Sequence, residues 1–201
     1  MSFDRVAWIY DQLAGLVFGS QWDQVQQAPV GNLAGKSRVL IVGGGTGLLL
    51  DALQDVEKIV FLELSEKMIA RSRNRGSHPR VDYVHADFFQ WETSEKFDAI
   101  VMPFFLDCFG TEKLEGAIFK ARTHLTENGE LHVIDFQSAS WWKNSLIHVM
   151  YLFFRLFSSL EGKTLLNIDG AIRNAQFGQK SESFLCDKWI FYSVYQPNRI
   201  T

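Results

Sequence analysis

From Arg38 onward, short runs of apolar and β-branched residues alternate with longer segments of helical periodicity. Strands that are apolar on both faces are typical of a parallel sheet covered by helices. The fold class is therefore α/β, with helices on both faces of the sheet. We expect strands at RVLIVGG, KIVFLEL, VDYVHAD, FDAIVMP and GELHVIDF, and helices from about Leu48, from about Ser65 and over Lys113–Leu125.

Segments near either end of the chain depart from this alternation. Residues 1–36 have helical spacing and predict short helices that form a lid. KSESFLC and KWIFYSVYQP have no helix-length stretch between them, so they should pair as an antiparallel hairpin at one end of the sheet. The 201 residues suit one domain. We divide them into the lid (1–36) and a domain of residues 37–201 with a helical insertion at about 138–175.

Charge and cysteine content argue against several classes of function. The net charge of −3 disfavours general binding to nucleic acid or to anionic membranes. Cys108 and Cys186 lie far apart and the five histidines have no ligand spacing, so we expect neither a disulfide framework nor a metal site. The N-terminus lacks the apolar core of an export signal, and the apolar segment Lys143–Leu160 is too short and interrupted to span a bilayer. A cytoplasmic location is expected.

Four glycines interrupt the end of the first strand, in VLIVGGGTGLLL. Because a helix is expected to follow, they should lie at the carboxyl edge of the sheet, where backbone N–H groups face a nucleotide-like ligand. Gly43, Gly45 and Gly47 give the spacing G-x-G-x-G. The dinucleotide fingerprint G-x-G-x-x-G needs glycine at position 48, which is Leu48.

Residues at the next strand ends also favour a nucleotide-like ligand. Glu63 closes the second strand, where a carboxylate can accept hydrogen bonds from both hydroxyls of a ribose. Asp87 closes the third, where it can accept from an adenine amino group while the N–H of Phe88 donates to a ring nitrogen. Taken singly, each acid is better explained as a helix cap or a solvated loop residue. The ordered series, which ends with Pro103 on the fourth strand, favours a binding site.

Over about residues 38–196 the chain resembles the class I S-adenosylmethionine-dependent methyltransferases. VLIVGGGTG, FLELSEKMIARSR, VHADFFQW and FDAIVMPFFLDCF are similar to the first four motifs of that family. The opening FDRVAWIYDQLAGLVFG resembles the leader of the ubiquinone/menaquinone-biosynthesis type. The resemblance implies a Rossmann-like, seven-stranded, mostly parallel sheet whose last strand is inserted antiparallel. It also implies S-adenosylmethionine as cofactor, held by Tyr10 of the leader and by Gly43, Gly45, Glu63, Leu64, Met68, Asp87, Phe88 and Pro103.

The first motif departs from the family at two positions. Ile41 stands where the family usually has Asp or Glu, and Gly44 where it often has Cys or Ser. In the family the acid helps hold the methionine ammonium group. Its absence implies a weaker affinity, or a contact moved to the backbone carbonyls of Gly43 and of Met102 or Pro103.

Asp107 is the candidate catalytic residue. It follows the fourth strand, where related enzymes often have a catalytic or substrate-facing residue, and an acceptor hydroxyl or acidic carbon would need a general base. The alternative is a cap on the turn before TEKLEGAIFK. Asp135, at the end of the fifth strand, could reach the pocket or cap a loop.

The helical insertion at about 138–175 contains a run of aromatic residues, here called the aromatic insertion. It predicts a small, apolar acceptor molecule. Its side chains could instead pack on the sheet or on the partner subunit of a homodimer. Two other functions share part of the pattern: a non-catalytic protein that binds S-adenosylmethionine, and a nicotinamide-dependent oxidoreductase. Leu48 and the terminal hairpin argue against the oxidoreductase. The insertion residues behind this prediction are Met150, Tyr151, Phe153, Phe154 and Phe157.

Overall fold

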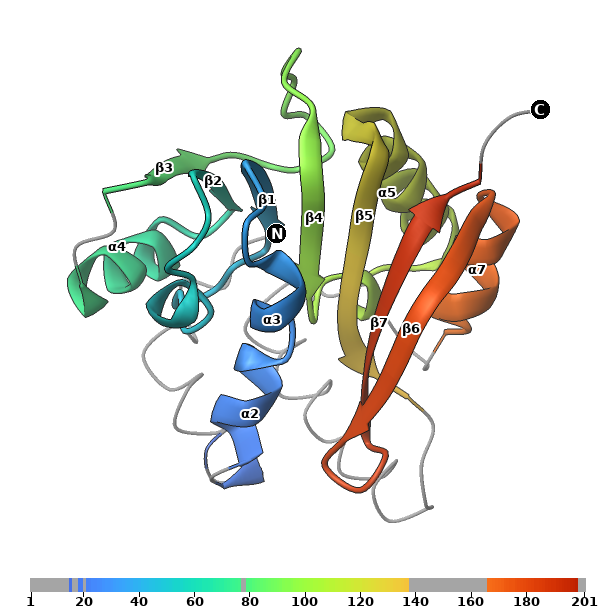
Figure 1. Cartoon of the computed structure of the whole chain (residues 1–201), viewed down its shortest axis with the longest axis horizontal. Helices are drawn as coiled ribbons and strands as arrows, with labels where there is room; N and C mark the ends of the chain where they lie inside the picture. Colours follow the sequence, from blue (N-terminus) through green and yellow to red (C-terminus); the bar gives the residue numbers. More distant parts are fainter. Residues whose placement is uncertain (1–14, 16–17, 20, 77–78, 138–165, 199–201) are drawn as a thin grey trace.

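A seven-stranded sheet forms the centre of the protein (Figure 1). The computed structural model describes residues 15, 18–19, 21–76, 79–137 and 166–198. The strand order is β3-β2-β1-β4-β5-β7-β6. The strands are β1 (Arg38–Val42), β2 (Lys58–Glu63), β3 (Val81–His85), β4 (Phe97–Pro103), β5 (Leu125–Phe136), β6 (Phe177–Leu185) and β7 (Ile190–Pro197).

The first five strands run parallel, and β7 lies antiparallel between β5 and β6. The expected terminal hairpin is therefore confirmed. Its turn places three successive residues in the left-handed region, Cys186, Asp187 and Lys188, with φ of 52°, 52° and 64°. The N–H of Trp189 closes the turn on the carbonyl of Leu185 at 3.1 Å.

Helices cover both faces of the sheet, as expected. In β1, Val39 and Ile41 belong to one apolar core and Leu40 to the other, which explains why the strand is apolar throughout. Helices α2 and α3 pack on the first face, α5 and α7 on the second. The helices are α2 (Gln21–Gln27), α3 (Val30–Leu33), α4 (Glu66–Arg75), α5 (Thr111–His124) and α7 (Ile168–Asn174), with the 3-10 turns η1 (Leu50–Ala52) and η2 (Leu106–Cys108).

The prediction of a helix from about Leu48 is wrong. Only the three-residue turn η1 forms there. Because Arg38 pairs with Lys58, the chain after the glycines must return along the full length of β1 before β2 begins. The return is made by η1 and by irregular chain up to Lys58. The helices predicted near Ser65 and over Lys113–Leu125 are confirmed, and the Ser65 side chain caps α4 by accepting from the N–H of Met68 at 3.2 Å.

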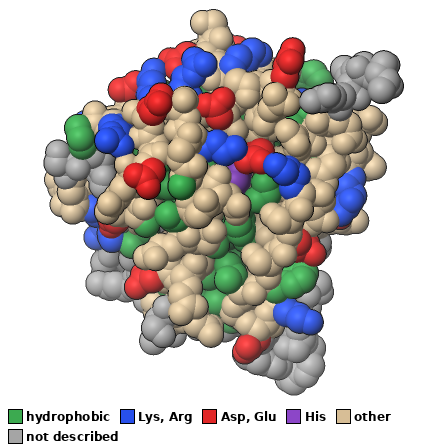
Figure 2. All heavy atoms as spheres, in the orientation of Figure 1, with side chains coloured by type: hydrophobic (Ala, Val, Ile, Leu, Met, Phe, Trp, Pro, Cys, Tyr) green, Lys and Arg blue, Asp and Glu red, His purple; other side chains and the backbone are tan. Residues whose placement is uncertain are grey.

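A polar network ties α3 to the sheet. Asn32 Nδ2 donates to the hydroxyl of Tyr192 at 2.9 Å, and this hydroxyl lies 2.9 Å from Nδ1 of the fully buried His132. The other ring nitrogen of His132 is 3.6 Å from Glu130, which also pairs with Lys36 at 2.7 Å. On this side of the molecule, Figure 2 shows hydrophobic side chains across the middle, below a region of acidic and basic ones.

Acid is expected to destabilise the protein through this network. Burial lowers the pKa of His132, and His132 together with the ammonium groups of Lys180 and Lys36 holds the pKa of Glu130 well below its usual range. Both groups bind fewer protons in the folded state, so stability falls as pH drops below 6.5 for the histidine and below 4.5 for the glutamate. Below pH 4.5, urea titrations should show a shallower acid slope in Glu130→Gln than in wild type, because the glutamine does not titrate. The same slope in both would contradict this account, with the exposed Glu127→Gln as control.

Candidate functional site

The glycine turn after β1 owes its composition to its backbone. Gly43, Gly45 and Gly47 have φ of 69°, 59° and 80°, the left-handed region that side chains disfavour. The turn is anchored where the N–H of Gly43 donates to the carbonyl of Leu62 at 2.9 Å. It therefore lies at the carboxyl edge of the sheet, as the sequence predicts.

Three of the four glycines are also required by neighbouring protein atoms. A Cβ would lie 2.9 Å from the Phe105 ring at Gly43, 2.2 Å from the Phe61 ring at Gly44 and 2.0 Å from Ser72 Oγ at Gly47. At Gly45 a Cβ would meet no atom of the described residues within 4 Å. Gly45 is thus the position of the turn that faces open space, where a ligand can approach the backbone.

Phe61 explains why Gly44 replaces the Cys or Ser of the resembled motif. Its fully buried ring occupies the space that a side chain at position 44 would need. We expect Gly44→Ser to lower the free energy of unfolding by about 1–3 kcal/mol, the usual cost of overpacking. In a Phe61→Leu background the same substitution should cost less. Urea unfolding of the four proteins measures the coupling, and an equal cost in both backgrounds would refute the explanation.

Glu63 joins the end of β2 to the glycine turn. Its carboxylate is 6 % exposed; one oxygen accepts from the N–H of Gly45 at 3.0 Å and the other from the N–H of Ser65 at 2.9 Å. A carboxylate has about four lone-pair sites and can accept several hydrogen bonds, so this is a residue type that suits the hydroxyl groups of a ligand. Ile41 is fully buried in the apolar core of β1, and an acid there would lie among apolar side chains.

The loop after β3 places Asp87 and Phe88 beside this region. Asp87 is half-buried and accepts from the N–H of Phe89 at 2.9 Å, so it also caps its own loop. Lys120 of α5 fixes the loop by donating to the carbonyls of Phe89 at 3.2 Å and Trp91 at 2.5 Å. Both interpretations of Asp87 are thus compatible, because one oxygen suffices for the cap.

Phe105 connects the ends of β1, β3 and β4, and sequence reasoning missed it. Its ring lies against Gly43 and meets the ring of Phe88 edge-on at a centroid distance of 5.7 Å. The only signal was the aromatic pair after Pro103. Pro103 ends β4, and Phe104 next to it has a φ of 50° and donates its N–H to the carbonyl of Ile134 at 2.7 Å.

The remaining predicted residues fall into two groups. Leu64 is half-buried and Met68 is 2 % exposed, both just beyond Glu63 in the chain. Tyr10 and the aromatic insertion lie outside the described residues. An aromatic cluster does form beside the ends of β4 and β5, with centroid distances of 5.0 to 6.0 Å between neighbouring rings. It consists of Phe18, Trp22, Phe104, Phe136 and Trp189.

Asp107 lies in η2 and is only 5 % exposed. The N-cap of α5 is Gly110, so Asp107 does not occupy that position. Its backbone N–H donates to Oδ2 of the fully buried Asp135 at 3.2 Å, and the thiol of Cys108 is 3.5 Å from its carboxylate. Burial, strengthened by the charge of Asp107, raises the pKa of Asp135 and that of Cys108 well above their usual ranges. The two strand-end acids singled out in the sequence are therefore neighbours.

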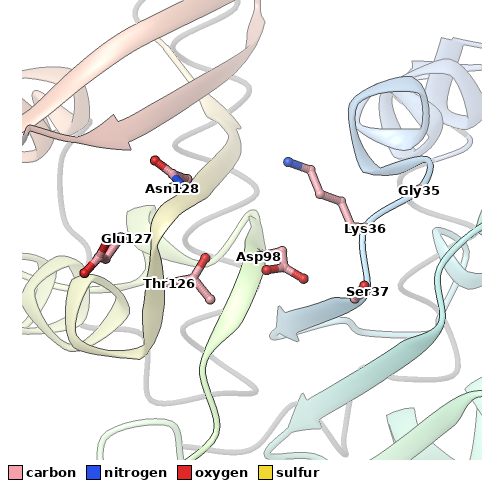
Figure 3. Close-up of a pocket in the computed structure, with 7 residues that line it drawn as sticks. All are labelled: Gly35, Lys36, Ser37, Asp98, Thr126, Glu127 and Asn128. Atoms are coloured by element: carbon pink, nitrogen blue, oxygen red, sulfur yellow. The ribbon is translucent and has the colours of Figure 1, made fainter.

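A polar hollow of about 480 Å³ lies at the opposite, amino edge of the sheet (Figure 3). Lys36 at its rim pairs with Glu130, and Asp98 accepts from the N–H of Arg38 at 3.0 Å. Gly35, Lys36, Ser37, Asp98, Thr126, Glu127 and Asn128 line it.

Among the described residues, no three His, Cys, Asp or Glu side chains are grouped to hold a metal ion. The described helices include none with the length and apolarity to cross a membrane.

Residues 39–129 match the family model of a methyltransferase domain. No curated protein matches the chain in sequence. Two solved structures illustrate the similarity in fold. One is the magnesium protoporphyrin IX methyltransferase ChlM of Synechocystis PCC 6803 with bound S-adenosyl-L-homocysteine (SAH). Its sequence is 14 % identical, and the TM-score is 0.72 over 98 % of this chain and 96 % of that one. The N-methyltransferase NodS of Bradyrhizobium japonicum WM9, in complex with SAH, is 14 % identical with a TM-score of 0.67, over 88 % and 85 %. The chain is similar to both in fold.

Proposed function

We propose that this protein transfers a methyl group from S-adenosylmethionine to a small, apolar acceptor, because residues 39–129 match the family model of a methyltransferase domain. The observation behind the proposal is the juxtaposition of Glu63 with the one glycine of the turn that faces open space, Gly45. We further propose a cytoplasmic protein in which residues 1–36 form the lid of the domain 37–201.

The carboxyl edge offers complementary groups for each part of the cofactor. Glu63 accepts from the ribose hydroxyls, since a carboxylate oxygen can accept more than one hydrogen bond. Asp87 accepts from the adenine amino group, and the N–H of Phe88 donates to a ring nitrogen. Leu64 and Met68 pack against the adenine, while Tyr10 of the lid closes over the site. At the methionine end of the cofactor, backbone carbonyls of Gly43 and Pro103 face the ammonium group. They replace the acidic side chain that the family usually has at the position of Ile41.

The chemistry that the protein must add is limited. The sulfonium methyl of S-adenosylmethionine is already activated, so the protein has to align the acceptor atom in line with the S–CH₃ bond and exclude water. Asp107 is the general base where the acceptor carries a proton. The aromatic cluster beside β4 and β5 supports an apolar acceptor, because it lies at the carboxyl edge of the sheet, as the glycine turn does.

Calorimetric titration with S-adenosylmethionine and SAH tests the cofactor assignment. We expect micromolar binding, on the order of −8 kcal/mol, and no competition by NADH. Glu63→Ala and Asp87→Ala should each weaken binding by at least about tenfold, since a hydrogen bond to a charged group contributes about 1.5–3 kcal/mol. Glu57→Ala, exposed before the opposite end of β2, is the matched control.

The titration also separates the alternatives. If the folded protein binds neither sulfur ligand, the cofactor assignment is wrong. Competition by NADH would favour the oxidoreductase. Binding without release of SAH across a panel of phenols, amines and quinols would favour the non-catalytic binder, which the apolar Ile41 in place of an acid makes the main rival.

A further inference from the structure

Two carboxyl groups meet inside the protein where β4 and β5 end. Asp135 is 0 % exposed and Asp107 is 5 % exposed. The backbone N–H of Asp107 donates to Oδ2 of Asp135 at 3.2 Å, and the N–H of Phe136 donates to Oδ1 at 2.8 Å. Asp135 is thus held by two backbone donors that fix its orientation toward η2.

The surroundings of the pair are acidic or apolar. The thiol of Cys108 lies 3.5 Å from Oδ1 of Asp107, and Glu63 is close enough to raise the pKa of that thiol. The fully buried Leu106 precedes Asp107 in η2, and neither carboxyl group is more than 5 % exposed. Two carboxylates in such a low-dielectric place cannot both be ionised without a large cost, so like carboxyl pairs retain a proton.

We propose that Asp107 and Asp135 hold one proton between them, with Asp107 facing the acceptor and Asp135 acting as the positioning residue that donates to it. This inference rests on the proposed methyltransferase function. Burial and the charge of Asp107 raise the pKa of Asp135, which supports the same distribution. Asp107 is then the ionised partner and carries the single negative charge of the pair.

The transfer step balances with this pair as proton acceptor. The acceptor X–H attacks the methyl carbon, the S–CH₃ bond breaks as the X–CH₃ bond forms, and its electron pair stays on sulfur to give neutral SAH. The proton of X–H passes to Asp107, and the pair returns it to solvent after the product leaves. The acceptor class follows: a neutral hydroxyl, amine or acidic C–H group fits, whereas a carboxylate or phosphate would be repelled by the negative pair.

Carbon-13 NMR of protein labelled at the aspartate carboxyl carbons tests the pair directly. We expect one carboxyl resonance that stays protonated at neutral pH, and its loss in Asp135→Asn. In that variant Asp107 should titrate at lower pH than the pair does, because the amide still donates but carries no charge. Asp107→Asn should in turn lower the pH at which Asp135 ionises, which keeps the test usable if one variant fails to fold. Asp98→Asn, at the amino edge, should leave the resonance unchanged.

Two results would overturn the inference. One is that both carboxyls are ionised at neutral pH; the other is that each variant leaves the titration of the remaining aspartate unchanged. SAH titration of the same samples distinguishes this failure from failure of the proposed function. Binding of SAH without a shared proton refutes the pair alone, whereas a shared proton without SAH binding removes the methyltransferase function and with it the catalytic role of Asp135.

Discussion

Asp107→Asn is expected to lower the rate of methyl transfer by about 10²–10⁴-fold, the usual contribution of a positioned general base. Asparagine has nearly the same shape and can accept from the Cys108 thiol, so the loss should appear in turnover with little change in SAH binding. The measurement is SAH release at saturating cofactor with an acceptor that carries an exchangeable proton, found by screening phenols, amines and quinols.

The control for this experiment is Asp98→Asn, which replaces a strand-associated aspartate at the opposite edge of β4. Its turnover should match wild type. If Asp107→Asn keeps full turnover, alignment alone drives the reaction and Asp107 has no role as a base. If it instead loses SAH binding, the residue contributes to the fold of the cofactor site rather than to proton transfer.

Gly45→Ala is expected to weaken binding of SAH by up to about a hundredfold, the upper end of about 1–3 kcal/mol for steric overpacking. Within the part of the chain that the structure describes, the added Cβ would meet no atom closer than 4 Å, so the loss reports on the ligand rather than on the packing of the turn. Calorimetric titration with SAH measures the affinity, and urea unfolding measures the stability of the same variant.

Gly35→Ala provides a matched control, because Gly35 has a φ of +75° and equally open surroundings but lies at the amino edge of the sheet. Both alanines should cost about 1–2 kcal/mol of stability through left-handed backbone strain. Only Gly45→Ala should weaken SAH binding. Equal affinity in the two variants would show that the open space at Gly45 holds no part of the ligand.

Local patterns in the sequence were sufficient to predict the sheet and the place of Glu63 at the end of β2. Strands that are apolar on both faces, a Ser65 cap and a terminal pair of strands each leave a signal within a few residues. The helix after the glycines was wrongly predicted because an apolar run as short as Leu48 to Leu50 does not distinguish a helix from a single turn, and only η1 forms there.

The contacts that complete the candidate site could not be predicted in the same way. Phe61 against Gly44, and Phe105 against Gly43, join residues on different strands or beyond them, and nothing in the local sequence pairs them. Asp107 and Asp135 were each recognised as strand-end acids. Their contact depends on β4 and β5 being neighbours and on the η2 turn directing a backbone N–H toward β5.

The position of β7 between β5 and β6 has a consequence for how the protein is synthesised. On the ribosome β5 emerges with one neighbour, β4, and its other edge from Leu131 to Phe136 has no partner until Ile190–Pro197 has been made. β6 emerges earlier, but in the folded protein it lies beside β7 and not beside β5. An unpaired strand edge is a site of aggregation, so the nascent chain is most exposed to misassembly during translation of residues 137–189.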